Sequence, residues 1–184
     1  MLKHLETLDT QLSALRPSYY SQLAPALTGD AIQALEKKYA TTLPSDVRQL
    51  YLWKNGQQPN CYEAFVNNSL FVSLEEMLDT AQELTSMIGS DFDVDNWWNA
   101  GWLPLFHNGG GSRICYDMNG IFTARKGQLI EYWNADSDRN VISPDLDTFL
   151  ASLSQYYATT PPEAFDEFFI IDPPQGFPER FIAG

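Results

Sequence analysis

The chain of 184 residues carries 24 acidic and 11 basic side chains, which gives a formal net charge of −13 at pH 7. Its hydrophobic content of 44% excludes a disordered chain, and its length suits one domain built around a single core. No run approaches the roughly 20 apolar residues of a membrane span, and the N-terminus has no signal-peptide pattern. We therefore expect a cytoplasmic protein that does not contact membranes.

The excess of acidic residues lies in the middle of the chain, because residues 55–112 contain neither Lys nor Arg. This stretch should repel nucleic acid, since affinity for a phosphate backbone comes from Lys and Arg. A basic protein would be attracted, and the long-range field would accelerate its association. Solubility alone is the competing explanation of the acidic composition.

Three helices are predicted in the first third of the chain. The second covers about residues 30–39, and the third begins near Pro44 and Asp46 and is predicted to end with Gly56 as its C-cap. Weak periodicity then predicts an exposed loop over residues 57–68. The first helix is indicated by leucines at helical spacing before Pro17, namely Leu2, Leu5, Leu8, Leu12 and Leu15.

A strongly periodic helix follows a short strand at residues 70–72. Ser73 and Glu76 form a capping box at its start, and Gly89 is expected to end it. The apolar residues share one face, so the acidic residues of this helix should lie on the opposite, solvated face. These predicted partner-binding residues are Glu75, Glu76, Asp79 and Glu83.

Beyond the helix, Asp91, Asp93 and Asp95 alternate with apolar residues, a spacing that invites a calcium-binding interpretation. An EF-hand loop requires Gly at its sixth position and Glu at its twelfth, where this chain has Asn96 and Trp102. We therefore predict no metal here and count the three carboxylates with the partner-binding surface.

Trp97 and Trp98 follow directly, and two adjacent residues can hardly both face inward on a regular element. One of them is expected at the surface beside the acidic residues, where exposed aromatic side chains often serve as protein-binding hot spots. A loop that packs on itself is the alternative. Both tryptophans are included in the predicted partner-binding set.

Cysteine and histidine give no support for a metal or a cofactor. His4 and His107 share no metal-ligand spacing with Cys61 and Cys115, so a structural zinc site is not expected. The two cysteines could pair, but without a secretion signal buried free thiols are favoured.

A buried hairpin is predicted over residues 101–117, where two apolar runs flank Asn108 and three glycines. Further strands are predicted at residues 121–124 and 128–133, and Asp117 is expected to accept hydrogen bonds in an Asx-type turn. Strands connected by consecutive hairpins imply a largely antiparallel sheet.

The last predicted helix is capped by Ser143 and opened by Pro144. The fold class is therefore α+β: a twisted, mostly antiparallel sheet flanked by N-terminal helices and a C-terminal helix. An apolar tail follows, which should dock on the domain as a helix or edge strand. The alternative is that it forms the partner-binding surface itself. Its large side chains are Phe165, Phe168, Phe169, Ile170 and Ile171.

The order of helix, Leu-Pro, helix, Asn-Gly, Trp-Leu-Pro strand, glycine turn and strand ending in Cys-Tyr-Asp resembles the SUKH superfamily, in the branch of fungal cell-wall-assembly regulators and bacterial immunity proteins. The resemblance covers about residues 30–153 of a single domain spanning residues 1–184. It departs at Gln57 and Gln58, where relatives often continue with glycine, and in an extension of about residues 159–184. The positions that carry it include Leu43, Pro44, Asn55, Gly56, Trp102, Pro104, Gly110 and Asp117.

Three functions follow as hypotheses. The resemblance favours a non-enzymatic immunity protein of a polymorphic toxin system, a monomer when free, which neutralises a cognate toxin with a basic surface by stoichiometric occlusion. A regulatory scaffold that docks a signalling partner is the second hypothesis. The third, a small hydrolase, is disfavoured because no carboxylate pair is marked by its spacing as an acid and base.

Overall fold

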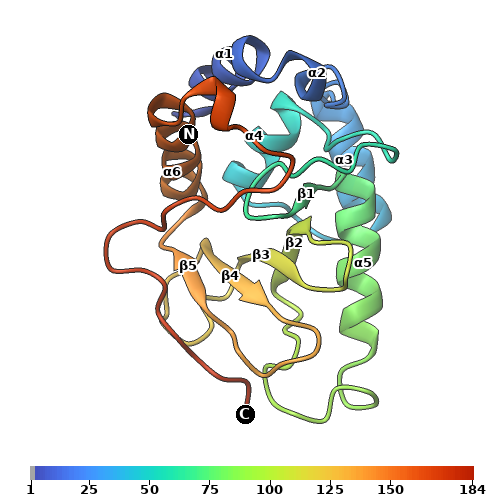
Figure 1. Ribbon diagram of the computed structural model, residues 1–184. Coiled ribbons are helices and arrows are strands. Elements are labelled where there is room, and N and C mark those ends of the chain that lie inside the picture. Colours follow the sequence, from blue (N-terminus) through green and yellow to red (C-terminus); the bar gives the residue numbers. More distant parts are fainter. Residues whose placement is uncertain (1–2) are drawn as a thin grey trace.

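The computed structural model describes residues 3–184, and it contains a five-stranded sheet in which each strand pairs antiparallel with its neighbour in the chain (Figure 1). The α+β class is confirmed. The strands are β1 Leu70–Phe71, β2 Trp102–His107, β3 Arg113–Asp117, β4 Gln128–Tyr132 and β5 Val141–Ser143.

The helices flank this sheet. α5 lies beside β2, whereas α6 lies beside β4 and β5 and packs against α1 (Figure 1). Leu2, predicted in the first helix, lies outside the described residues. The α-helices are α1 Leu5–Leu15, α2 Pro17–Tyr20, α3 Gly29–Lys38, α4 Ser45–Trp53, α5 Leu74–Ser86 and α6 Leu146–Thr159, and a short 3-10 turn, η1, spans Pro162–Ala164.

Side chains alternate across each strand, and both faces of the sheet are buried. Tyr116 and Leu129 are paired across β3 and β4 and point into the main core beneath the helices. Their neighbours Cys115 and Ile130 point the other way, into a smaller cluster around Trp102. Loops and tail residues cover this second cluster, and both cysteines are buried free thiols.

Residues 57–68 form an irregular loop, as predicted, but the loop is only partly exposed, because Cys61, Phe65 and Val66 are buried. Side chains satisfy its backbone, which allows an irregular segment to enter the core. Gln57 Nε2 donates to the carbonyls of residues 61 and 63 at 2.9 and 3.0 Å, and Arg16 Nη1 donates to the carbonyl of Ala64 at 3.0 Å.

The strand predicted at residues 121–124 is wrong, because these residues form turns in which Phe122 and Ala124 have positive φ. The turn is organised by Asp117, which is fully buried and accepts the backbone N–H groups of residues 119, 120 and 121 at 2.6 to 3.0 Å. Gln128 Nε2 donates to the same carboxylate at 2.9 Å. The Asx-type role predicted for Asp117 is confirmed.

Two details of the C-terminal half differ from the prediction. Ser143 ends strand β5, which the sequence pattern did not reveal, and it does not cap the next helix. The cap of α6 is Asp145, whose carboxylate accepts the N–H of Thr148 at 2.7 Å.

The tail docks on the domain, as predicted, but residues 165–171 run as an irregular extended segment and form neither a helix nor a regular strand. Ala64 N donates to the carbonyl of Glu167 at 2.8 Å and Asn68 N to that of Phe169 at 3.0 Å. Phe169 and Ile171 are buried, while the alternate residues Phe168 and Ile170 are 56% and 70% exposed.

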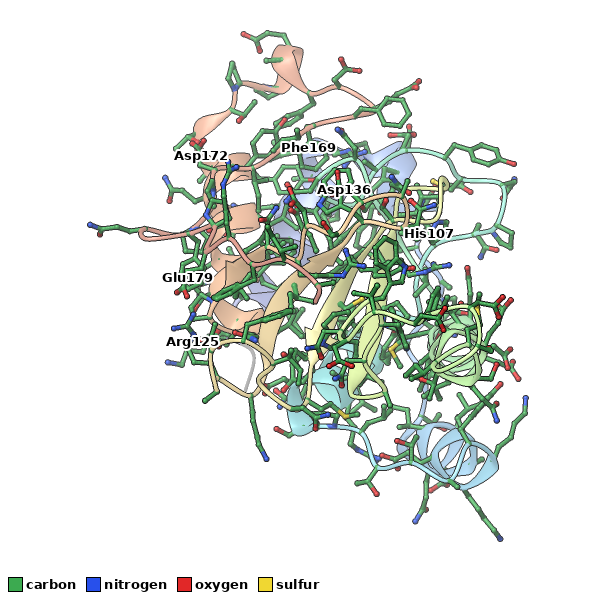
Figure 2. The ribbon with its side chains drawn as sticks, turned by 90° about the horizontal axis from the view of Figure 1, so that it is seen from below. His107, Arg125, Asp136, Phe169, Asp172 and Glu179 are labelled. Carbon is green, nitrogen blue, oxygen red and sulfur yellow. The ribbon has the colours of Figure 1, made fainter. Side chains whose placement is uncertain are left out.

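The end of the tail extends the sheet along β5. Val141 and Glu179 exchange two backbone hydrogen bonds of 2.9 Å, and Ala183 N donates to the carbonyl of Ser137. Figure 2 shows Arg125 and Glu179 side by side, where they form an ion pair of 2.5 Å. The extension is thus part of the folded domain.

Candidate partner-binding surface

The acidic surface depends on how α5 is anchored. Ser73 caps the helix by accepting the N–H of Glu76 at 3.2 Å, and Asn55 Oδ1 accepts the N–H of Leu74 at 2.9 Å. Gly56 has φ of +77°, and a Cβ there would lie 2.6 Å from the backbone of Val72 and Ser73. α4 ends at Trp53 with Lys54 as its C-cap, so Gly56 serves this close approach and not the predicted cap.

The acidic residues of α5 point to two sides. Glu75 forms an ion pair with Lys38 of α3, with 2.7 Å between Oε1 and Nζ, and Asp79 accepts a hydrogen bond from the Tyr39 hydroxyl. Residues 55–112 contain no Lys or Arg, but folding brings a lysine from an earlier helix to Glu75, so this carboxylate does have a compensating cation. The ion pair is exposed and contributes little to stability.

Glu76 faces a different neighbour. Its Oε1 lies 3.7 Å from Nε2 of His107 at the end of β2. Burial lowers the pKa of His107, so the imidazole is uncharged at neutral pH and does not neutralise the carboxylate. Within residues 3–184, neither Glu76 nor Glu83 forms an ion pair with Lys or Arg.

The loop after α5 presents Asp91, Asp93 and Asp95, and all three are exposed. The carbonyl of Asp95 accepts the N–H of Gly184 at 2.9 Å, which joins this loop to the chain end. Across the described residues, no group of three or more His, Cys, Asp or Glu side chains is placed to hold a metal ion.

The two tryptophans separate, as expected, but only one is available to a partner. Trp98 is 3% exposed and meets Trp102 and Tyr132 edge to face at centroid distances of 5.6 and 5.2 Å. It is therefore a core residue, and its place in the partner-binding set is wrong. Trp97 is half-buried.

Arg139 is the residue that the sequence analysis missed, because a single arginine in an Asp-Ser-Asp-Arg-Asn run is typical of an exposed turn. It is completely buried, with its guanidinium 5.0 Å from the Trp97 ring centroid. It donates to the carbonyls of Trp97, Trp133, Asp136 and Asp138 at 2.6 to 3.2 Å. Burial lowers the pKa of Arg139, whereas the carbonyls and the faces of the Trp97 and Tyr132 rings stabilise its positive charge.

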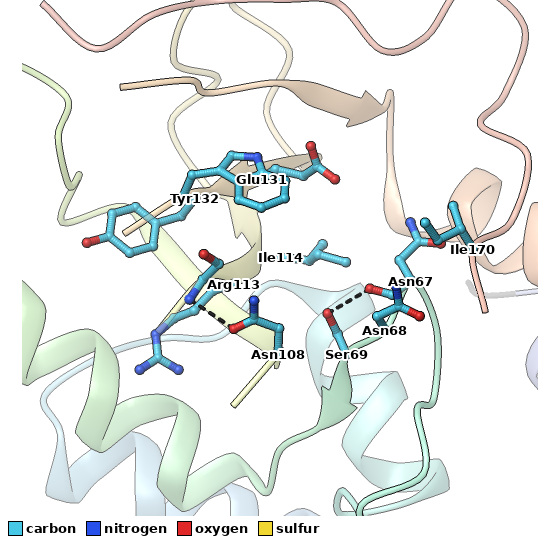
Figure 3. Close-up of a pocket in the computed structure, with 11 residues that line it drawn as sticks. Asn67, Asn68, Ser69, Asn108, Arg113, Ile114, Glu131, Tyr132 and Ile170 are labelled. Carbon is cyan, nitrogen blue, oxygen red and sulfur yellow. Dashed lines mark hydrogen bonds between the residues drawn. The ribbon is translucent and has the colours of Figure 1, made fainter. Parts of the chain in front are cut away.

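The hollows along the sheet include two at the end of β2 and beside β3 and β4. One, of about 460 Å³, lies between residues 57–62, β1, the first turn of α5 and the end of β2, and Glu76 and His107 line it. The other, of about 230 Å³, is drawn in Figure 3. Asn67, Ile114 and Ile170 surround it, and it contains none of the predicted site residues. The acidic surface therefore adjoins the first hollow.

None of the helices within residues 3–184 is long and apolar enough to cross a membrane. The family description "SMI1 / KNR4 family (SUKH-1)" matches residues 26–152, which contain all five strands, helices α3, α4 and α5, and the first half of α6. No curated protein matches the chain. The family includes immunity proteins and cell-wall regulators. Because the match covers well over half of the chain, the protein belongs to the SMI1/KNR4 family (SUKH-1).

Proposed function

We propose that this protein is a cytoplasmic immunity protein that binds a cognate bacterial toxin through a basic surface of the toxin and neutralises it by stoichiometric occlusion. Family membership supports the class of function. The observation that supports a basic partner is a set of exposed acidic residues on α5 and the following loop, which form no ion pair with Lys or Arg within residues 3–184. This set consists of Glu76, Glu83, Asp91, Asp93 and Asp95.

The proposal assigns no catalysis and no cofactor. Glu83, Asp91, Asp93 and Asp95 are exposed on a helix face and a loop, whereas acid and base residues of enzymes are usually held in clefts. Glu76 lines the hollow beside His107, and we assign it to partner binding. An acidic surface can occupy the place of an anionic substrate on a toxin, and binding is then sufficient for neutralisation.

A regulatory scaffold is the second candidate. The exposed side chains of Phe168 and Ile170 favour it, because they form an apolar edge on an otherwise docked tail. The gene context separates the candidates, since an adjoining toxin-like reading frame favours immunity and its absence favours a scaffold.

Co-expression with the product of the adjoining reading frame tests the proposal. We expect a 1:1 complex by size-exclusion chromatography with light scattering, and loss of toxin activity at equimolar protein. A neighbouring product that stays separate and fully active at excess protein would contradict the immunity function.

Reversing three acidic residues on this surface is expected to slow association with the basic partner. In Glu83→Lys, Asp93→Lys, Asp95→Lys the long-range attraction is lost, so the association rate at low salt should fall about tenfold while the dissociation rate changes less. Stopped-flow fluorescence at two salt concentrations measures both rates. The difference should shrink at high salt.

The matched control reverses three exposed acidic residues of the tail: Glu163→Lys, Glu167→Lys, Asp172→Lys. Both triple variants change the net charge equally, but the tail segment that carries the control residues lies on the side of α6, away from α5 (Figure 1). Equal slowing in both variants would show that net charge, and not this surface, guides the partner.

A further inference from the structure

The hollow beside Glu76 has walls that are fixed by hydrogen bonds; we call it the Glu76 groove. Gln57 forms one wall, and its amide oxygen accepts from the Tyr19 hydroxyl and the Phe71 N–H, both at 3.0 Å. Its amide nitrogen holds the carbonyls of residues 61 and 63. A fixed groove loses little entropy when it is filled.

The floor and rim of the groove suit a long side chain with an apolar stem. Phe71 and Leu70 of β1 line the floor together with Cys61. Phe71 is itself held by ring contacts with Tyr51 and Phe106 at 5.6 Å. Tyr62 stands on the rim with 73% of its surface exposed, as large aromatic residues do at protein-binding hot spots.

The charge of the groove is negative. Glu76 is its carboxylate, 54% exposed, and His107 beside it is uncharged at neutral pH. Among residues 3–184, no Lys or Arg lines the groove. The start of α5 does not reverse this sign, because Asn55 and Ser73 already take the N–H groups of Leu74 and Glu76 that could bind an anion.

We infer that the Glu76 groove receives an arginine side chain of the basic partner, with the guanidinium at the Glu76 carboxylate and against the Tyr62 ring. The planar guanidinium can pair with a carboxylate through two hydrogen bonds and also stack on an aromatic face. Its three methylene groups fit the apolar floor at Phe71. The inference rests on the proposed function, because it names how the same acidic surface recognises its partner.

NMR titration with Nα-acetyl-arginine methylamide tests the groove without any partner protein. We expect amide shifts at Tyr62, Glu76 and Gly109 that saturate, and no such shifts with the matching citrulline compound, which keeps the shape and lacks the charge. Glu76→Gln should weaken arginine binding about tenfold, because it removes a charge-assisted bond. Glu83→Gln removes the same charge from the same helix outside the groove and should weaken arginine binding much less than Glu76→Gln does.

Three results would overturn the assignment. Equal shifts with the arginine and citrulline compounds would show that binding does not depend on the charge. Stronger binding of Nα-acetyl-lysine methylamide would show that the groove receives a lysine side chain and not an arginine. Equal losses in Glu76→Gln and Glu83→Gln would show a diffuse field and no groove. If the partner protein is available and forms no complex, the proposed function is refuted, and the result of the arginine titration is unaffected. A complex that Glu76→Gln weakens no more than Glu83→Gln would refute the groove alone.

Discussion

Removing residues 161–184 is expected to lower the free energy of unfolding by about 4–8 kcal/mol, which is a large part of the stability of an ordinary domain. The tail buries Phe169 and Ile171 against the core and adds backbone pairing to β5 through Glu179. Each large buried apolar side chain contributes about 1.5–3 kcal/mol. Urea denaturation followed by circular dichroism measures the loss, and a truncated chain that melts like the full chain would contradict the docked tail.

A matched pair of substitutions keeps this prediction testable if the truncated chain does not fold. Phe169→Ala should destabilise by about 3 kcal/mol, because Phe169 stacks on Tyr156 at 4.7 Å and is 9% exposed. The adjacent Phe168→Ala removes the same side chain from a site that is 56% exposed and should change stability by less than about 1 kcal/mol. Equal effects of the two substitutions would contradict the alternation.

The same pair addresses the alternative role of the tail. Docking and exposure were opposed as interpretations of the sequence, but the extended segment does both, because its residues alternate between the core and solvent. If Phe168→Ala keeps the melting temperature and weakens partner binding, the outer row of the tail belongs to recognition. Unchanged binding would leave the tail a structural role.

The elements that could be predicted are those with strong local signals. The hairpin over residues 101–117 and helix α5 each combine a clear hydrophobic period with a marked turn or cap, and both occur where expected. Such signals need no knowledge of distant residues. The resemblance to the SUKH superfamily depends on the same local features, and this explains why the family could be identified from one sequence.

Two of the failed predictions involve hydrogen bonds from side chains that the hydrophobic pattern does not reveal. Residues 121–124 look like a strand by composition, but the Asp117 carboxylate accepts the N–H groups of residues 119, 120 and 121 and so starts a turn. Residues 57–68 look like an exposed loop, but Gln57 and Arg16 satisfy their carbonyls inside the core. Composition and period do not reveal which side chain will supply such a bond.

The candidate site shows the same division. Exposure of the acidic residues on α5 followed from helical periodicity, whereas the pairing of Glu75 with Lys38 links residues 37 positions apart and had no local signal. Burial of Trp98 was likewise undecidable between two adjacent tryptophans. The groove beside Glu76 could not be anticipated, because its walls come from four separate segments.

Replacing Arg139 with alanine is expected to destabilise the protein by about 3–5 kcal/mol, comparable to removing one member of a buried ionic interaction. The substitution removes the donor that links the carbonyls of Trp97, Trp133, Asp136 and Asp138, and it removes the cation between the Trp97 and Tyr132 rings. Urea denaturation measures the loss. Hydrogen exchange should also show faster exchange over residues 133–138 than in the helices.

The control for charge is Arg180→Ala. Arg180 is an exposed arginine of the C-terminal tail, so this substitution should change the free energy of unfolding by less than about 0.5 kcal/mol. The control for geometry is Arg139→Lys, which keeps a cation near Trp97 but lacks the planar fork that reaches carbonyls on two segments, so we expect an intermediate loss. A lysine variant as stable as the wild type would show that charge alone matters at this site. If Arg139→Ala is no less stable than Arg180→Ala, the loops around Trp97 do not need the Arg139 hydrogen bonds. This expected order of stabilities would show that Arg139 supports the acidic surface, because Arg139 donates to the carbonyl of Trp97 and Trp97 belongs to the loop that carries Asp95.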